Sequence, residues 1–184
     1  MILLRHGQSE FNLHFTATRQ DPGIEDPRLT PLGERQAEQA ADALAGEAVG
    51  RIIASPYTRA LQTAAPLARR LGLPVLVSAA IRERYAFKCD IGSPVADLAQ
   101  AWPGHDFSAI DDVWWPTQAE PEAHVVARAD RFRAEMAADP EWRRTVVVSH
   151  WGFILALTGS SVQNGMWIRC DATAPAPSEI VWRP

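Results

Sequence analysis

The chain has 184 residues, of which 47% are hydrophobic and 22% charged, proportions that are ordinary for a soluble globular protein. This length is typical of one domain with a substantial core. The formal net charge of -4 gives no support for binding to nucleic acid or to an anionic membrane. No apolar run approaches the roughly 20 residues that are needed to span a bilayer. A soluble protein without nucleic-acid or membrane partners is therefore expected.

The cysteines and the first residues bear on the compartment. Cys89 and Cys170 lie far apart and form no C-x-x-C motif. No signal peptide precedes the apolar run that starts at Met1, so a cytoplasmic protein is expected. In that compartment both cysteines are expected to be free thiols.

Strand and helix patterns alternate along the chain. The apolar residues Met1 to Leu4 predict a buried strand, and Thr30-Pro31 predicts a helix start with threonine as N-cap and proline at the first helical position. An apolar stripe at helical spacing follows as far as Leu44. The same periodicities predict, in chain order, a strand at 51–54, a helix at 57–71 ended by Gly72, a strand at 75–77, a short helix from 93 to about 102, a helix at 121–139, a strand at 145–149, a helix at 153–158 and strands at 166–170 and 179–183.

The order of these elements indicates the fold class. Strands separated by helices predict parallel βαβ units, so an α/β fold is expected: a three-layer sandwich with a mostly parallel central sheet flanked by helices. Residues 84–120 differ, because they are rich in Pro, Asp and Trp and have no clear period. They are too long for a simple connection. We therefore expect one domain over 1–184, in which 84–120 forms a substrate-specificity insertion or lid.

Charged and imidazole side chains follow several of the predicted strands. Arg5 and His6 follow the first strand, His150 follows the strand at 145–149, and Arg59 lies in the first turns of a helix after another strand. If these strands are central neighbours, the side chains converge at one sheet edge. Two guanidiniums suit the oxygens of a phosphoryl group, and a neutral imidazole can attack phosphorus. Glu83, after the third strand, is the candidate acid for the leaving oxygen.

The same residues belong to motifs that resemble a known family. The motifs are Arg5-His6-Gly7 with its continuation to Asn12, Leu29-Thr30-Pro31-Leu32-Gly33-Glu34-Arg35-Gln36-Ala37, and Ser55-Pro56 through Arg59-Ala60 to Gln62-Thr63. They resemble R-H-G, L-T-x-x-G-x-x-Q-A and S-P-x-x-R-A-x-Q-T of the histidine phosphatase superfamily, also called the phosphoglycerate-mutase-like family. The resemblance runs from Met1 to about Leu157.

The resemblance implies a role for each matching residue. His6 would be the phosphorylated nucleophile, and Glu83 would act first as general acid and then as general base. The residues that would bind the phosphoryl group are Arg5, Asn12, Arg59 and His150. Two features depart from the family pattern. The stretch from Asn12 to Leu29 is a few residues longer than usual, and Trp151 stands where a glycine commonly follows the histidine, so we expect Trp151 to form an aromatic wall beside the phosphate.

The aromatic residues of 84–120 permit two interpretations. They are Tyr85, Phe87, Trp102, Trp114 and Trp115. Such residues often mark core packing, but their density in an aperiodic segment also suits a pocket that recognises a leaving group with apolar or ring surface.

Together these observations predict a histidine acid phosphatase-type phosphomonoesterase that acts on a small-molecule phosphomonoester through a phosphohistidine. No cofactor is implied, and no H-x-H or H-E-x-x-H spacing indicates a metal site. A phosphoglycerate mutase is the alternative enzyme, supported faintly by Arg84-Tyr85. A catalytically silent phosphoester-binding module is the third interpretation, which the intact set of candidate catalytic residues disfavours. The motifs specify neither the natural substrate nor the oligomeric state.

Overall fold

A computed structural model describes residues 1–182 of the chain. Within this range the strands are β1 (Ile2–Arg5), β2 (Arg51–Ala54), β3 (Val75–Val77), β4 (Thr145–Ser149) and β5 (Trp167–Arg169). The α-helices are α1 (Glu10–Thr18), α2 (Pro31–Ala45), α3 (Thr58–Leu71), α4 (Val95–Ala101), α5 (Glu122–Ala138) and α6 (Trp151–Thr158). Short 3-10 turns lie at η1 (Ala79–Ile81), η2 (Lys88–Asp90) and η3 (Trp142–Arg144).

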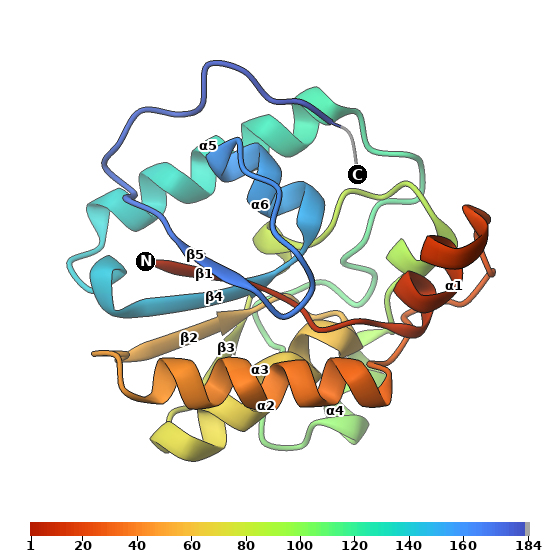
Figure 1. The fold of residues 1–184 in the computed structure, drawn as a ribbon, viewed down its shortest axis with the longest axis horizontal. Coiled ribbons are helices and arrows are strands. Elements are labelled where there is room, and N and C mark those ends of the chain that lie inside the picture. The colour runs from red at the N-terminus through yellow and green to blue at the C-terminus, as the bar shows by residue number, and fades with distance from the viewer. Residues whose placement is uncertain (183–184) are drawn as a thin grey trace.

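The strands form one sheet in the order β3-β2-β4-β1-β5, parallel except for the antiparallel edge strand β5. Helices α2 and α3 cover one face of the sheet, and α5 and α6 cover the other (Figure 1). The expected α/β sandwich with a mostly parallel sheet is confirmed. The central strands β2, β4 and β1 lie side by side, so their carboxyl ends meet at one edge.

Strand β4 contains a continuous apolar run, Val146 to Val148, because it lies in the core. All five of its residues are buried, because helices pack on both faces. Val146 and Val148 face the cluster that contains α2 and α3, whereas Val147 faces the cluster that contains α5 and α6. The period of two along a strand thus divides the apolar side chains between two half-cores.

The helix boundaries follow local capping chemistry. The backbone N–H of Gly33 donates to Thr30 Oγ1 at 3.1 Å, so Thr30 is the N-cap of α2 and Pro31 is its first residue, as predicted. Gly72 ends α3 with φ 64°, a left-handed conformation that glycine adopts without a steric penalty. The observed helices α3, α4, α5 and α6 differ from their predicted ranges by no more than two residues at either end.

Two features differ from the sequence prediction. Helix α1 was not predicted, although Ser9 caps it by accepting from the Asn12 N–H at 3.4 Å. Phe11 and Phe15 are four residues apart, as on one face of a helix, but a single such pair is too short a pattern to predict a helix. The strand predicted at 179–183 is wrong over 179–182, which has no regular structure, and residue 183 lies outside the described range. Trp182 packs against Trp151 and does not join the sheet.

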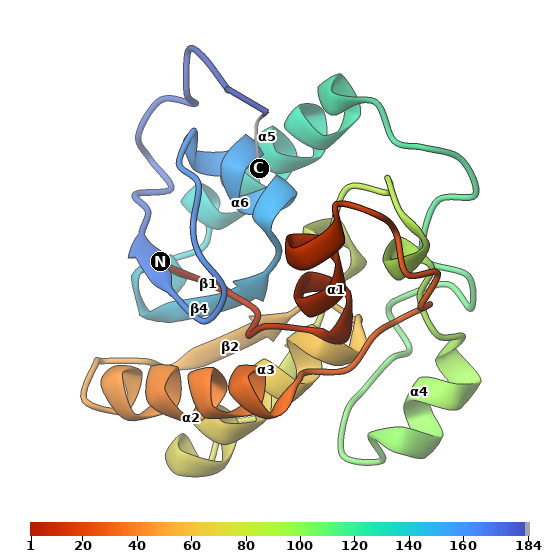
Figure 2. The same cartoon turned by 45° about the vertical axis from the view of Figure 1, so that its right-hand side comes forward.

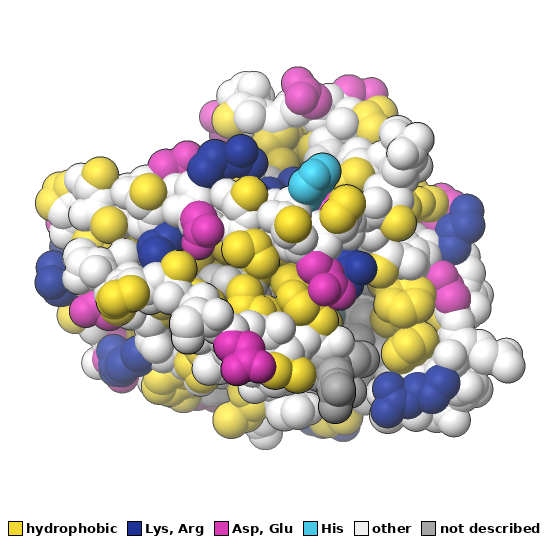
Figure 3. Space-filling view, turned by 90° about the horizontal axis from the view of Figure 1, so that it is seen from above, with side chains coloured by type: hydrophobic (Ala, Val, Ile, Leu, Met, Phe, Trp, Pro, Cys, Tyr) yellow, Lys and Arg dark blue, Asp and Glu magenta, His cyan; other side chains and the backbone are white. Residues whose placement is uncertain are grey.

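No α-helix among residues 1–182 is both long enough and apolar enough to cross a membrane. On the face seen in Figure 3, basic and acidic side chains are interspersed among apolar ones rather than gathered by sign. Cys89 and Cys170 are both free thiols, as expected.

Candidate active site

The pairing of β1 with β4 brings two histidines together at the carboxyl edge of the sheet. Arg5 is the register partner of Ser149, and the backbone N–H of His6 donates to the Ser149 carbonyl at 3.0 Å. His6 and His150, one residue beyond each strand, therefore lie with their ring centroids 5.1 Å apart. Both side chains are buried.

The hydrogen bond of the His6 ring identifies its free nitrogen. Nδ1 lies 2.7 Å from the backbone carbonyl oxygen of Gly7, which can only accept, so Nδ1 carries the proton. Nε2 is then left with its lone pair for attack. Burial and the positive charges of Arg59 and Arg5 lower the pKa of His6 well below its usual value, which keeps the ring neutral at pH 7.

At Gly7, the loop after β1 approaches α2 so closely that there is no room for a side chain. A Cβ on Gly7 would lie 2.4 Å from the carbonyl oxygen of Gly33, a distance that no side chain tolerates. The Gly7 N–H also donates to Thr63 Oγ1 on α3 at 3.1 Å. The loop that carries His6 is thus fixed to both helices below the sheet.

Two arginines supply positive charge beside His6. Arg5 Nη1 donates to the Val162 carbonyl at 2.8 Å, and burial lowers its pKa to about 10, so it remains charged at pH 7. Arg59 Nη1 donates to the Cys89 carbonyl at 2.8 Å, and its Nη2 lies 3.4 Å from an oxygen of Asp90. The charge of Arg59 acts on both histidines and helps to lower the pKa of each.

His150 is fully buried, and its ring nitrogens have no hydrogen-bond partner within residues 1–182. Its ring packs edge-on against Tyr57 with centroids 5.0 Å apart. Burial, together with the charge of Arg59, lowers its pKa well below the usual value. A neutral imidazole here has an N–H available for an oxygen bound beside His6.

Glu83 approaches the same site from the turn after η1. Its carboxylate accepts from the backbone N–H groups of Arg84 at 2.8 Å and Gly152 at 2.9 Å. Burial raises its pKa, and the nearby Asp90 carboxylate adds to the effect. A raised pKa favours the protonated carboxyl that a general acid requires.

A buried ionic cluster holds the segment before Glu83. Arg128 on α5 donates to the carbonyls of Ala80 at 2.9 Å and Arg82 at 2.8 Å. The Glu120 carboxylate pairs with both Arg128 and Arg82, each at 2.9 Å. The backbone on the amino side of Glu83 is therefore fixed from α5.

These side chains meet at a cavity of about 580 Å³. Arg5, His6, Asn12, Arg59, Glu83 and Trp151 all line it, and the ring of His150 lies against that of His6, with centroids 5.1 Å apart. The geometry therefore brings together every site residue that the sequence predicted. Asn12 Oδ1 accepts from Asn164 Nδ2 at 3.1 Å, which turns the Asn12 amide nitrogen to other partners.

Comparison with known proteins identifies the family. Residues 1–170 match the model of the histidine phosphatase superfamily (branch 1). The protein belongs to this superfamily. Among curated relatives of this histidine phosphatase, a glucosyl-3-phosphoglycerate phosphatase of Mycobacterium tuberculosis (strain ATCC 25618 / H37Rv) is 33% identical over 169 residues, which cover 87% of this chain and 74% of the relative.

Two further comparisons extend the similarity. A probable phosphoglycerate mutase of Proteus mirabilis (strain HI4320) is 31% identical over 158 residues, covering 82% of this chain and 68% of the relative. The solved structure of a mycobacterial glucosyl-3-phosphoglycerate phosphatase in complex with VO3 has a TM-score of 0.64 and 29% identity, with 91% of this chain and 90% of that chain covered. The curated phosphatases support phosphomonoesterase activity for this histidine phosphatase.

For the aromatic residues of the aperiodic segment 84–120, the structure distinguishes core packing from a role in the pocket. Trp114 is buried, packs edge-on against Tyr57 and donates Nε1–H to the Ser93 carbonyl at 3.0 Å. Trp115 packs against the same core. Trp114 is therefore a core residue, and Trp115 is a partly buried residue at the edge of the core. Of the segment 84–120, only Arg84, Ala86, Phe87, Cys89 and Asp90 line the cavity.

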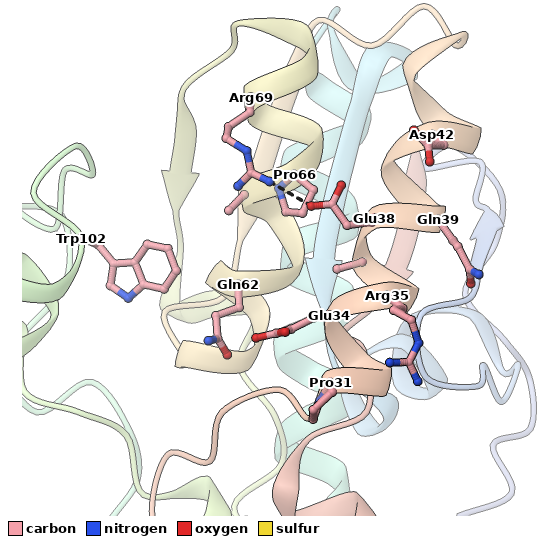
Figure 4. Close-up of a pocket in the computed structure, with 12 residues that line it drawn as sticks. Pro31, Glu34, Arg35, Glu38, Gln39, Asp42, Gln62, Pro66, Arg69 and Trp102 are labelled. Carbon is pink, nitrogen blue, oxygen red and sulfur yellow. Dashed lines mark hydrogen bonds and ion pairs between the residues drawn. The ribbon is translucent and has the colours of Figure 1, made fainter.

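Trp102 lines a different groove, of about 720 Å³, along α2 and α3 (Figure 4). There Arg69 pairs with Glu38 at 3.0 Å, and none of the predicted site residues is present. This groove is separate from the histidine site.

Several residues of the cavity were missed by sequence reasoning. They are Phe15, Arg19, Asp90, Gln163, Asn164 and Trp182. The signal for the first two was the cap at Ser9, which starts α1. The others come from irregular segments, where no periodicity indicates which side chains turn inward.

Proposed function

We propose that this histidine phosphatase hydrolyses small phosphomonoesters through a phosphohistidine formed on His6 Nε2. The observation that carries the proposal is the bond from His6 Nδ1–H to the Gly7 carbonyl, which leaves Nε2 as the free nucleophile beside two guanidiniums. Because phosphoryl transfer depends mostly on positioning and charge stabilisation, this arrangement supplies the main requirements of catalysis.

The first half-reaction forms the phosphoenzyme. Arg5 and Arg59 neutralise the phosphoryl oxygens, and the neutral His150 donates a hydrogen bond to one of them. His6 Nε2 forms the N–P bond as the ester P–O bond breaks. The protonated Glu83 gives its proton to the leaving oxygen, and the alcohol departs.

In the second half-reaction the roles reverse. The Glu83 carboxylate takes a proton from a water molecule, whose oxygen attacks phosphorus as the N–P bond breaks. Inorganic phosphate leaves, and His6 and Glu83 return to their first states. Asn12, whose oxygen is already held by Asn164, offers its amide N–H groups to the phosphoryl group in both steps.

The substrate we propose is a small phosphorylated metabolite, consistent with a cavity of about 580 Å³. Hydrolysis is favoured over mutase activity by the lining of the cavity beyond the phosphoryl site. That part carries several aromatic side chains, whereas phosphoglycerates are small and highly charged.

The proposal is tested by labelling. After brief incubation with a 32P-labelled phosphomonoester and an alkaline quench, the label should be found on His6, at Nε2. His6→Ala should lose both label and turnover while keeping its melting temperature. A label on another residue, or turnover that survives in His6→Ala, would refute the mechanism. Transfer of the label to phosphoglycerate instead of water would identify a mutase.

A further inference from the structure

The part of the cavity beyond the phosphoryl site has an aromatic wall from α1 and the η2 turn. Phe11, Phe15 and Phe87 form a mutually packed triad, with ring centroids 5.1, 5.2 and 5.0 Å apart, and all three line the cavity. Phe87 remains 37% exposed, so the triad is not a closed core. Helix α1 lies beyond the carboxyl end of β1 (Figure 2), which places this wall next to His6.

A second aromatic group lines the same cavity. Trp151, the first residue of α6, packs edge-on against Trp182 with centroids 6.2 Å apart. Trp151 Nε1–H donates to Ser161 Oγ at 2.9 Å, which fixes the ring. Trp182 comes from the C-terminal segment, so five aromatic rings from four separate segments meet around one space.

The acidic residues of this cavity lie at one end of it. Its acidic residues, Glu83 and Asp90, belong to the phosphoryl end, where they contact α6 and Arg59. Arg19 lies beside the phenylalanine wall, 5.8 Å from the Phe15 ring centroid, and has no acidic partner within residues 1–182. Arg84 lies 5.5 Å from the Trp182 centroid and is already paired with Glu122. Beyond the phosphoryl end, Arg19 is therefore the lining cation that remains available to the rest of a ligand, among the residues the structure describes.

We infer that this space binds the leaving group of the substrate, and that the leaving group is an alcohol bearing an apolar ring with an anionic substituent directed at Arg19. The inference rests on the proposed function and adds the substrate class to it. Apolar rings bury their faces and edges against aromatic walls, and an anion beside an unpaired guanidinium gains a charge-assisted hydrogen bond.

The test uses esters that share the same kind of leaving oxygen. We would compare kcat/KM for ethyl phosphate, 2-phenylethyl phosphate and 2-(4-carboxyphenyl)ethyl phosphate. The phenyl ring should raise kcat/KM by about tenfold or more, as expected for burial of an apolar ring. The carboxylate should raise it further by several fold. A higher kcat/KM for glucose 6-phosphate than for 2-phenylethyl phosphate would overturn the choice of an apolar ring.

Substitutions test which residues produce the gain in kcat/KM from the phenyl ring and from the carboxylate. Phe15→Ala and Trp182→Ala should each lower kcat/KM for 2-phenylethyl phosphate more than for ethyl phosphate, and so reduce the preference between the two esters. Leu13→Ala and Val181→Ala, at exposed neighbouring positions outside the cavity lining, are the matched controls. Arg19→Met should abolish only the gain from the carboxylate, whereas Arg28→Met removes the same charge outside the cavity and should leave it intact.

Binding of non-hydrolysable phosphonates separates this inference from the proposed function. By calorimetry, 2-phenylethylphosphonate should bind about tenfold more tightly than ethylphosphonate, and Phe15→Ala and Trp182→Ala should both weaken the former more than the latter. Equal affinities, or a preference retained in both variants, would overturn the leaving-group site even if His6 is phosphorylated. The preference without any phosphorylation of His6 would support the site and refute the proposed function.

Discussion

The backbone N–H of Gly152 donates to both carboxylate oxygens of Glu83, at 2.9 and 3.2 Å. Gly152 lies two residues after His150, so the first turn of α6 links the candidate general acid to the histidine pair. A Cβ on Gly152 would stand 2.5 Å from Glu83 Oε1. The glycine that follows Trp151 therefore sets the position of the carboxyl group.

Gly152→Ala should displace Glu83 and slow the hydrolysis of alkyl phosphates by about 10²-fold, the lower range of general acid catalysis. Inhibition by inorganic phosphate should change little, because His6 and the arginines stay in place. Steady-state kinetics with both measurements checks this. Gly104→Ala is the control, since a Cβ there meets no atom within 4 Å. Unchanged alkyl phosphate turnover in Gly152→Ala would contradict the assignment of Glu83.

Glu83→Gln should slow hydrolysis of an alkyl phosphate by about 10²–10⁴-fold, because an alkoxide leaves poorly without a proton. Phosphoenzyme formation from an aryl phosphate should be slowed less, since a phenolate leaves unassisted. Rapid-quench measurement of that step for both esters provides the comparison. Equal losses would show that Glu83 does not protonate the leaving oxygen.

Stability should fall in mildly acidic solution because His6 and His150 are buried as neutral rings. Burial is the main cause that lowers the pKa of both histidines well below its usual value in the folded protein. As the pH falls below about 6.5, the unfolded chain therefore binds more protons than the folded protein does. The free energy of unfolding should therefore decrease from pH 7 towards pH 5. Denaturant titrations should show a smaller decrease for the His6→Asn/His150→Asn double variant, whereas the exposed His14→Asn should match the parent.

Arg128→Met should destabilise the fold by about 3 kcal/mol or more, since it removes one partner of a buried ion pair and two bonds to backbone carbonyls. Because one carbonyl precedes Glu83, kcat for alkyl phosphates should also fall more than inhibition by inorganic phosphate changes. Arg131→Met, at an exposed position on the same helix, is the matched control. A purely structural role would instead lower the melting temperature without altering the kinetics of the folded enzyme.

Turnover should be unaffected by exhaustive chelation. Arg5 and Arg59 supply positive charge at the place where a divalent ion acts in many other phosphoryl-transfer enzymes. Rates before and after treatment with a chelator test this expectation. A large loss that one divalent ion restores would mean that the charge stabilisation has been assigned to the wrong groups.

The sequence by itself determined which side chains meet at the candidate active site. Arg5-His6-Gly7 and His150 each follow a buried apolar run, and the parallel order of an α/β sheet places such residues at a common edge. The motif around Arg59 and the strand before Glu83 could be identified from the sequence for the same reason. Local patterns suffice where a residue is fixed by the strand or helix that carries it.

Only the tertiary structure decided what surrounds that centre. Trp114 and Trp102, both candidates for the pocket wall, lie in the core and in a separate groove, whereas Phe15, Arg19 and Trp182 reach the cavity from a short helix and an irregular tail. Side-chain direction in irregular segments has no period, and it is set by long-range packing such as that of Trp182 on Trp151. The candidate reacting groups could therefore be predicted from the sequence, but the lining of the rest of the cavity could not.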